Sequence, residues 1–242
     1  MAEGPQAVRE ALALEGVVIE VFADAEATDR HPELRTRAGE TSVPWQVASV
    51  EVVAAISQTV RPQGVVARCS FLDVPLEALV ARLPRLVAVC ADMRDPGNAG
   101  SVLRCADAAG AEGVVLVGDS VDPYNPKAVR ASAGSLFHID VVVEPDPVQA
   151  IDLLRSRGLR VIAADGRADI DLDAAADGSL LLEPTAWLFG NEAWGLPDAV
   201  RELAEVSVRV PIYGRAESLN LATAAAVCLY ASARAQRAAL AP

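Results

Sequence analysis

The sequence predicts an α/β protein with a small first unit and a larger second unit that contains a mostly parallel sheet. Apolar, β-branched runs alternate with helix-like segments along most of the 242 residues. The connections between them are short, as in parallel sheets whose two faces are covered by helices. This alternation pauses at residues 73–84, a stretch that contains prolines near both ends, and restarts at residue 86.

The first unit is expected at residues 1–72. Its opening helix, at 5–14, places Val8, Ala11 and Leu12 on one side. Strands are expected at 17–22, 43–48 and 64–69, and further helices at 32–38 and 50–58. Residues 73–83 are expected to form a short helical linker.

The second unit is expected at residues 84–242. Its strands are predicted at 86–90, 114–117, 139–143, 159–164, 186–189 and 206–210. Its helices are predicted at 98–109, 126–133, 147–157, 196–204 and 218–237, and the Asp- and Gly-rich stretch 165–178 is predicted to be a surface loop with at most one helical turn. The last helix carries almost no charge, which indicates burial in a core or an interface. Ligands of such sheets bind at the carboxyl ends of the strands.

Composition limits the kinds of partner. The longest uncharged apolar run, 218–233, is shorter than the roughly 20 residues of a membrane span. The first residues do not resemble a signal peptide, so we expect a cytoplasmic protein with no membrane partner. The net charge of −12, taken alone, argues against a nucleic-acid partner, because phosphate binding depends on Lys and Arg.

The cysteines and histidines do not suggest a metal site. Cys69, Cys90, Cys105 and Cys228 lack CxxC spacing, and only two histidines are present. We therefore expect no metal and interpret the four cysteines as reduced core residues.

The first segment that suggests chemistry follows the predicted strand 86–90. Asn98 is a good N-cap, and free N–H groups behind it favour a polar or anionic ligand. Arg104 shares a helical stripe with Gly100 and leans back toward the helix N-terminus. The segment lacks the spacing of a dinucleotide-binding loop, and on its own it also fits an ordinary capped helix with a surface arginine.

Two later segments place polar residues after predicted strands. In the first, Glu192 either accepts hydrogen bonds from a ligand or caps the next helix, and Trp194 is either a core anchor or a stacking platform. In the second, Ser218 suits the N-cap of the last helix. Between these segments and the first, Lys127 and Arg130 are neighbours on one helix face, which either holds a phosphate or is solvated.

Together, and in this order, the segments resemble the three motifs of the SpoU/TrmH class of SPOUT RNA methyltransferases. The motif positions are Asn98, Gly100 and Arg104, then 189–196, then 211–212 with 218–220. Residues 125–135 resemble what members carry between the first two motifs, and Ala193 stands where many members have glycine. Residues 3–12 resemble the opening of the substrate-binding domain, of ribosomal protein L30e type, found in many rRNA-modifying members.

The resemblance implies an architecture and an activity. It implies an L30e-like RNA-binding domain at 1–72 and a SPOUT domain at 84–242 with a trefoil knot near the C-terminus. Members are homodimers, joined here through the knot and the last helix, that bind S-adenosylmethionine in the knot. They transfer its methyl group to a ribose 2′-hydroxyl of structured RNA, for which the first domain favours rRNA over tRNA.

The resemblance also implies roles for residues at matching positions. The cofactor-binding residues would be Phe189, Gly190, Asn191, Val210, Ile212, Ser218 and Leu219, and the catalytic residues Asn98, Arg104, Glu192, Ser218 and Asn220. Arg104 would either help to deprotonate the hydroxyl or stabilise the developing alkoxide and position a phosphate, because a guanidinium is a poor base. Lys127 and Arg130 would contact RNA phosphate, Arg130 from the other subunit.

Three alternatives remain open at this level. One is a non-catalytic RNA-binding or ribosome assembly factor that keeps the knotted fold. Another is a tRNA 2′-O-methyltransferase. A third is a methyltransferase for a small molecule or a protein, which the acidic charge would suit.

Overall fold

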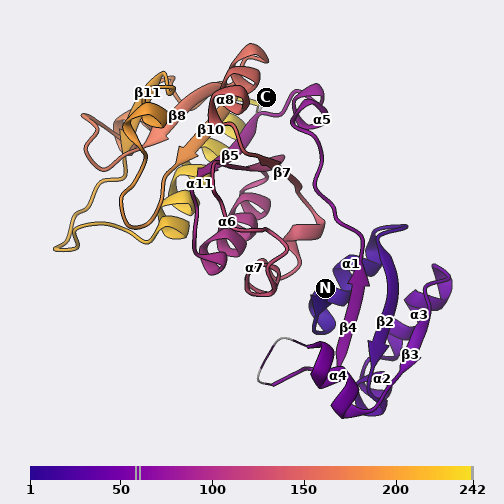
Figure 1. The fold of residues 1–242 in the computed structure, drawn as a ribbon. Coiled ribbons are helices and arrows are strands. Elements are labelled where there is room, and N and C mark those ends of the chain that lie inside the picture. Colours follow the sequence, from indigo (N-terminus) through magenta and orange to yellow (C-terminus); the bar gives the residue numbers. More distant parts are fainter. Residues whose placement is uncertain (58, 60, 241–242) are drawn as a thin grey trace.

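Two β-sheets, one in each part of the chain, organise the molecule (Figure 1). The computed structural model describes residues 1–57, 59 and 61–240. The strand order is β1-β4-β2-β3 in the first sheet and β7-β6-β5-β10-β8-β11-β9 in the second. No helix in these residues is long and apolar enough to cross a membrane.

The first sheet is mixed. Its strands are β1 (Ala2–Glu3), β2 (Val18–Ala23), β3 (Trp45–Val47) and β4 (Val65–Cys69), and its helices are α1 (Pro5–Ala13), α2 (Ala25–Arg30), α3 (Pro32–Glu40) and α4 (Val50–Ile56). Strand β4 is antiparallel to β1 and β2, whereas β3 is parallel to β2. Gln58, the last residue of the helix predicted at 50–58, lies outside the described residues. The sequence does not predict β1 or α2, although Asp24 caps α2 by accepting a hydrogen bond from the backbone N–H of Ala27.

All neighbouring strands of the second sheet are parallel, which confirms the prediction. Its strands are β5 (Leu86–Ala91), β6 (Gly113–Val117), β7 (Asp140–Glu144), β8 (Arg160–Ala164), β9 (Ile170–Asp171), β10 (Thr185–Phe189) and β11 (Val206–Arg209). The helices are α5 (Leu76–Ala81), α6 (Pro96–Ala109), α7 (Pro126–Ala131), the 3-10 helix η1 (Ser135–Phe137), α8 (Pro147–Ser156), α9 (Leu172–Asp177), α10 (Asp198–Arg201) and α11 (Leu221–Leu240).

Two predicted segments differ in the structure. The stretch 165–178 is not a simple loop, because it forms β9 and α9, and α9 buries Leu172 and Ala175 in the core. The predicted helix 196–204 is reduced to α10, a single turn after Pro197. Residues 241–242 of the predicted second unit lie outside the described residues.

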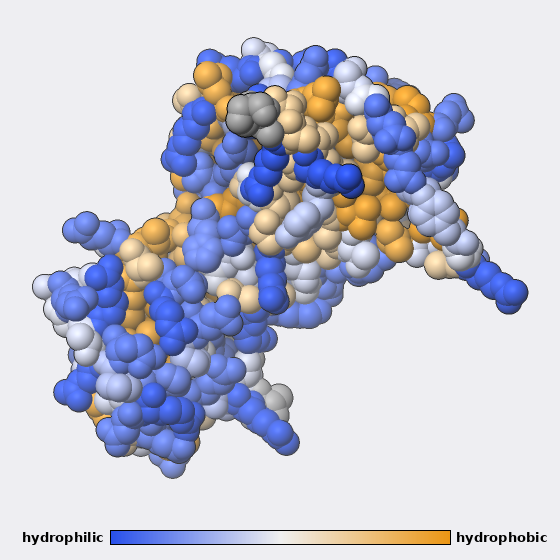
Figure 2. All heavy atoms as spheres, turned by 180° about the vertical axis from the view of Figure 1, so that it is seen from behind, coloured by the Kyte–Doolittle hydropathy of each residue, from blue (hydrophilic) through white to orange (hydrophobic). Residues whose placement is uncertain are grey.

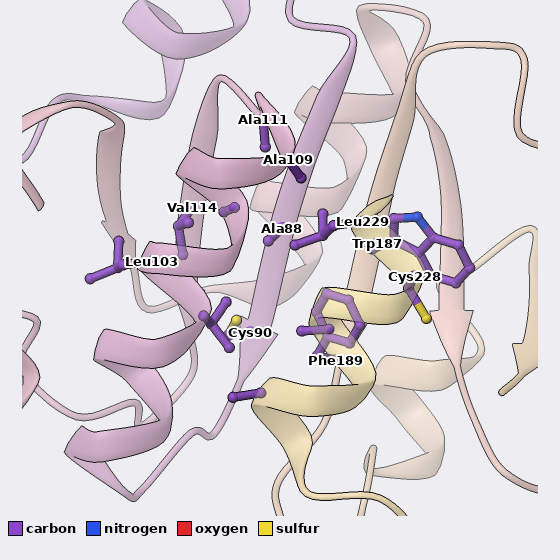
Figure 3. Close-up of a cluster of buried hydrophobic side chains, with 14 of the residues drawn as sticks. Ala88, Cys90, Leu103, Ala109, Ala111, Val114, Trp187, Phe189, Cys228 and Leu229 are labelled. Atoms are coloured by element: carbon purple, nitrogen blue, oxygen red, sulfur yellow. The ribbon is translucent and has the colours of Figure 1, made fainter. Parts of the chain in front are cut away.

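Helices cover both faces of the second sheet. One face packs against α6, α9 and α11, and the other against α5 and α8. Figure 3 shows Trp187 and Phe189 of β10 beside Cys228 and Leu229 of α11. The indole N–H of Trp187 donates a hydrogen bond of 2.9 Å to the hydroxyl of Ser232, so the polar atom in this core is satisfied. This packing holds α11 against the strand that leads into the loop 190–195.

The first unit packs against α7 and η1 of the second unit (Figure 1). The side-chain amide of Gln6 donates to the carbonyl of Ala133 over 2.9 Å, and Phe137 packs in the core of the first unit. His138 lies between Glu10 and Asp107, with contacts of 3.2 and 2.8 Å to their carboxylates. The two units are therefore connected by side-chain contacts as well as by the chain.

Candidate functional site

A cavity of about 720 Å³ lies at the carboxyl ends of β8, β10 and β11. Its walls come from residues 164–166, 189–193, 195, 208–210, 212, 217–221 and 224. Every residue expected to bind the cofactor lines it, namely Phe189, Gly190, Asn191, Val210, Ile212, Ser218 and Leu219. The position agrees with the rule that ligands of parallel sheets bind where the strands end.

The loop after β10 folds back on itself at Gly190. A Cβ at Gly190 would lie 2.3 Å from the backbone carbon of Gly195, so no other residue fits without a shift of the loop. The backbones of Asn191 and Gly195 exchange two hydrogen bonds of 2.9 Å. The glycine therefore serves the close approach of the chain to itself.

Asn191 fastens this loop to β5. Its side chain is buried, and its amide donates a 2.7 Å hydrogen bond to the carbonyl of Asp92 at the end of β5. Its Oδ1 accepts from the N–H of Ala193. Asn191 thus supports one wall of the cavity from inside the protein.

A chain of hydrogen bonds connects the three sequence motifs. The Asn98 amide donates to Oε1 of Glu192 over 2.7 Å, and the Asn220 amide donates to Oδ1 of Asn98 over 3.0 Å. Of the predicted catalytic residues, the structure brings together Asn98, Glu192 and Asn220, with Ser218 in the same cavity wall. Glu192 accepts a hydrogen bond from Asn98, and it caps no helix among the described residues.

The N-caps differ from those expected. Helix α6 begins at Pro96, and Asp95 caps it by accepting from the N–H of Asn98, which places Asn98 in the first turn. Helix α11 begins at Leu221, and Asn220 caps it by accepting from the N–H groups of Ala222 and Thr223. Asn220, and not Ser218, is the N-cap, so one side chain both starts α11 and joins the polar chain.

Arg104 lies apart from these residues. It is exposed on α6, and in the part of the chain that the structure describes it has no hydrogen bond or ion pair and does not line the cavity. Among the described residues, the Arg104 guanidinium therefore does not join the polar chain.

Lys127 and Arg130 both have acidic partners. The ammonium of Lys127 lies 2.8 Å from Oδ2 of Asp95, and this contact is the main cause that lowers the pKa of Asp95. Arg130 is 3.3 Å from Oε2 of Glu3 in the first unit. The two side chains point to different partners even though they share one helix.

Some residues of the cavity are not predicted by the motifs. Ala164, Asp165 and Gly166 form a wall where β8 ends, a position that the rule for parallel sheets could have indicated. Burial opposes ionisation of Asp165, but hydrogen bonds from Arg167 outweigh it and lower its pKa. The cavity therefore has an anionic wall on the side of β8.

Burial decides between the two interpretations of Trp194, and it places only Cys90 and Cys228 of the four cysteines fully in the core. Trp194 is 59% exposed, so it is not a core anchor. Cys90 and Cys228 are buried, and burial raises the pKa of each thiol to about 12, with the charge of Glu192 adding to the effect at Cys90. Both are therefore inert toward electrophiles near neutral pH. No cluster of three or more potential metal ligands occurs among residues 1–57, 59 and 61–240.

The cavity suits a ligand of nucleoside size. Its volume lies within the range of about 300–1,000 Å³ that is usual for small-molecule sites. The lining includes apolar side chains such as Phe189, Val210 and Leu219 and polar ones such as Glu192 and Asn220. This combination provides an apolar surface for a planar ring and hydrogen-bonding groups for its polar substituents.

Comparison with known proteins identifies relatives over most of the chain. Residues 85–230 match the family described as "SpoU rRNA Methylase family", and residues 1–75 match "RNA 2′-O ribose methyltransferase substrate binding". The chain is 34% identical over 230 residues to the 23S rRNA (guanosine(2553)-2′-O)-methyltransferase RlmP of Bacillus subtilis, which covers 95% of this chain and 86% of the relative. It is 39% identical over 144 residues to the 23S rRNA (uridine(2479)-2′-O)-methyltransferase of Streptomyces viridochromogenes, over 57% of this chain and 49% of the relative.

Solved structures show the same fold. The SpoU methyltransferase AviRb from Streptomyces viridochromogenes, in complex with the cofactor AdoMet, superposes with a TM-score of 0.83 at 30% identity, over 98% of this chain and 90% of the other. An AdoMet-bound rRNA methyltransferase from Sinorhizobium meliloti superposes with a TM-score of 0.82 at 30% identity, over 96% of this chain and 86% of the other.

Proposed function

Because this chain belongs to the SpoU rRNA methylase family, we propose that it transfers a methyl group from S-adenosylmethionine to a ribose 2′-hydroxyl of rRNA. The observation that carries the proposal is the hydrogen-bonded chain Glu192–Asn98–Asn220 beside the cavity. It joins residues from all three motifs at the carboxyl edge of the sheet. The 23S rRNA 2′-O-methyltransferases named above support the choice of substrate.

The cofactor would occupy the cavity at the ends of β8, β10 and β11. Phe189, Val210, Ile212 and Leu219 would hold its apolar parts, and Ser218 its polar groups. When bound, S-adenosylmethionine supplies a methyl group on a positively charged sulfur. The AdoMet-bound neighbours support this assignment.

The polar chain would orient the acceptor. Glu192 and Asn220 hold the Asn98 side chain from two sides, which fixes its orientation at low entropic cost when RNA binds. Arg104 would stabilise the alkoxide that develops on the 2′-oxygen or position the neighbouring phosphate, since a guanidinium remains protonated and is a poor base.

A homodimer would complete the site. Arg104 does not line the cavity of its own chain, among the described residues, which supports a contribution from a second copy. On α11, Ala225, Cys228 and Leu229 are buried, whereas Tyr230 remains 52% exposed beside a hollow of about 650 Å³. Figure 2 shows that the exposed apolar surface on the face it presents gathers mainly on the larger unit. An interface through α11 and the knot would cover such surface.

The domain assignments belong to the same proposal. They are an L30e-like domain at 1–72, a linker at 73–83 and a knotted SPOUT domain at 84–242, and the two family matches, at 1–75 and 85–230, support a division near residues 75–85. Helix α5, inside the linker, packs on the second sheet. Lys127 and Arg130 would contact RNA phosphate after leaving their acidic partners. An rRNA substrate is in keeping with the cytoplasmic location expected from the sequence.

The test is methyl transfer from labelled S-adenosylmethionine to rRNA, bulk tRNA and ribosomal subunits, with Arg104→Ala in parallel. We expect label in rRNA, resistance of the modified linkage to alkali, and loss of transfer in the variant. Label confined to tRNA would favour the tRNA alternative. Cofactor binding without label in any RNA would favour a non-catalytic factor.

A further inference from the structure

A polar cleft separates the two units on the side of β1 and α7. Its volume is about 190 Å³. The first unit contributes Glu3, Gln6, Arg61 and Gln63 to its walls, and the second contributes Arg130. A water molecule takes about 30 Å³ in the liquid, so the cleft has room for a phosphodiester group with part of its hydration shell.

Arg61 has no carboxylate partner in the part of the chain that the structure describes. Four of the six arginines in residues 1–72 have a carboxylate within 4.0 Å: Arg9, Arg30, Arg37 and Arg68. Arg61 and Arg35 have no such partner and no side-chain hydrogen bond among residues 1–57, 59 and 61–240. Both are exposed, but only Arg61 lines the cleft.

Arg130 contributes a second guanidinium to the same cleft. Its contact with the Glu3 carboxylate can be replaced by a contact with another anion. Its Nη1 lies 3.3 Å from Oε2 of Glu3, just beyond the usual range for an N–H···O hydrogen bond. The Glu3 side chain is only 10% exposed, and its other oxygen accepts a hydrogen bond from the hydroxyl of Thr59. Glu3 thus keeps one partner if Arg130 turns toward another anion.

Amide groups complete the lining. A Cβ at Gly4 would lie 2.6 Å from Oε1 of Gln63, so the Gln63 amide rests on the chain where β1 ends. The Gln6 amide donates to the carbonyl of Ala133 and connects the two walls. Amides donate hydrogen bonds to phosphate oxygens without adding charge.

We propose that this cleft binds a phosphodiester of the RNA substrate, with Arg61 and Arg130 as its charged contacts and Gln63 as a neutral donor. The inference rests on the proposed function and names one place where the RNA is held. A protein of net charge −12 repels a polyanion over most of its surface, so affinity must come from local sites where guanidinium groups converge. When the RNA binds, the Arg130 guanidinium leaves the Glu3 carboxylate and contacts the phosphate. Because the cleft lies at the junction, one RNA can contact both units.

The test compares Arg61→Gln with Arg35→Gln, a matched loss of one exposed arginine from the same unit. Binding to an in-vitro 23S rRNA transcript is measured over a series of salt concentrations, together with methyl transfer and cofactor affinity. For Arg61→Gln we expect about tenfold weaker binding near 0.1 M salt. The slope of the logarithm of the binding constant against the logarithm of the salt concentration should be smaller in magnitude by about one. Arg35→Gln should match the wild type, and cofactor affinity should be unchanged in both variants.

Each outcome decides the inference. Equal binding and equal salt slopes for the two variants would overturn it, and if the wild type still methylates rRNA the proposed function would stand. Failure of the wild type to bind the transcript would overturn the inference, and failure to methylate any RNA would overturn the proposed function. As a second variant, Glu3→Gln keeps a polar partner for Thr59 and should bind the transcript at least as tightly as the wild type. Weaker binding of that variant would contradict the exchange at Arg130.

Discussion

The amide of Asn220 donates a hydrogen bond of 3.0 Å to Oδ1 of Asn98, a residue 122 positions earlier in the chain. Asn98 in turn donates to Glu192. The same Asn220 side chain caps α11 through its Oδ1. The start of the last helix and the polar chain of the site are therefore linked through one side chain.

Replacement of Asn220 should affect stability and the site together. Asn220→Ala removes the N-cap, and we expect a loss of about 1 kcal/mol in the free energy of unfolding, measured by chemical denaturation. Methyl transfer should fall as well, because Asn98 loses one of its two partners. Ser218→Ala should leave stability unchanged, since Ser218 caps no helix in the described part of the chain. A larger stability loss for Ser218→Ala than for Asn220→Ala would contradict this assignment.

Arg104 should act on the cavity of a second copy. Arg104→Ala and Glu192→Ala should each abolish most methyl transfer when assayed alone. Mixed dimers of the two variants contain one cavity that has an intact Glu192 and faces an intact Arg104 from the other copy. We expect activity to return to roughly a quarter of the wild-type level after random mixing, because half of the dimers are mixed and each has one complete site. No recovery in dimers shown to be mixed would mean that each chain uses its own Arg104.

Alanine at Gly190 should disrupt the cavity. The added Cβ would meet the backbone of Gly195 at 2.3 Å, so the loop must move away from β10. We expect Gly190→Ala to lose measurable cofactor binding in calorimetry. The control is Gly39→Ala in α3, where a Cβ meets nothing within 4 Å and helix propensity favours alanine. Unchanged cofactor affinity in Gly190→Ala would show that the loop tolerates the shift.

The junction between the units should depend on pH through His138. The hydrogen bond to Asp107, followed by that to Glu10, raises the pKa of His138 above its ordinary value of 6.5, although partial burial opposes the shift. A raised pKa in the folded state means that the stabilisation is complete below pH 6.5 and is lost as the pH rises through the folded-state value.

The measurement is the difference in unfolding free energy between the wild type and His138→Gln as a function of pH. The difference should be largest below pH 6.5 and should diminish at higher pH. Since the His138 side chain is 42% exposed, we expect no more than about 1 kcal/mol. A difference that does not vary with pH would indicate that His138 contributes by packing alone.

Periodicity predicted most of the second sheet because each strand has a local signature. The runs at β5, β6, β8 and β10 are apolar on both faces, as buried parallel strands are. The same signal failed at α9, where frequent Asp and Gly conceal the two apolar positions, Leu172 and Ala175, that the core buries. Nor does periodicity give the neighbours of a strand, such as the place of β10 between β5 and β8.

The sequence by itself determined the family, the class of fold and the residue types of the site, because motif order and hydrophobic spacing are properties of the linear chain. Tertiary structure alone decided that Asn220 rather than Ser218 starts α11, that Glu192 accepts from Asn98, and that Arg104 lies outside its own cavity. It also decided that Arg61 and Arg130 line one cleft. Such relations depend on how strands distant in sequence align and on how helices pack across them. Residue spacing along the chain encodes neither the alignment nor the packing.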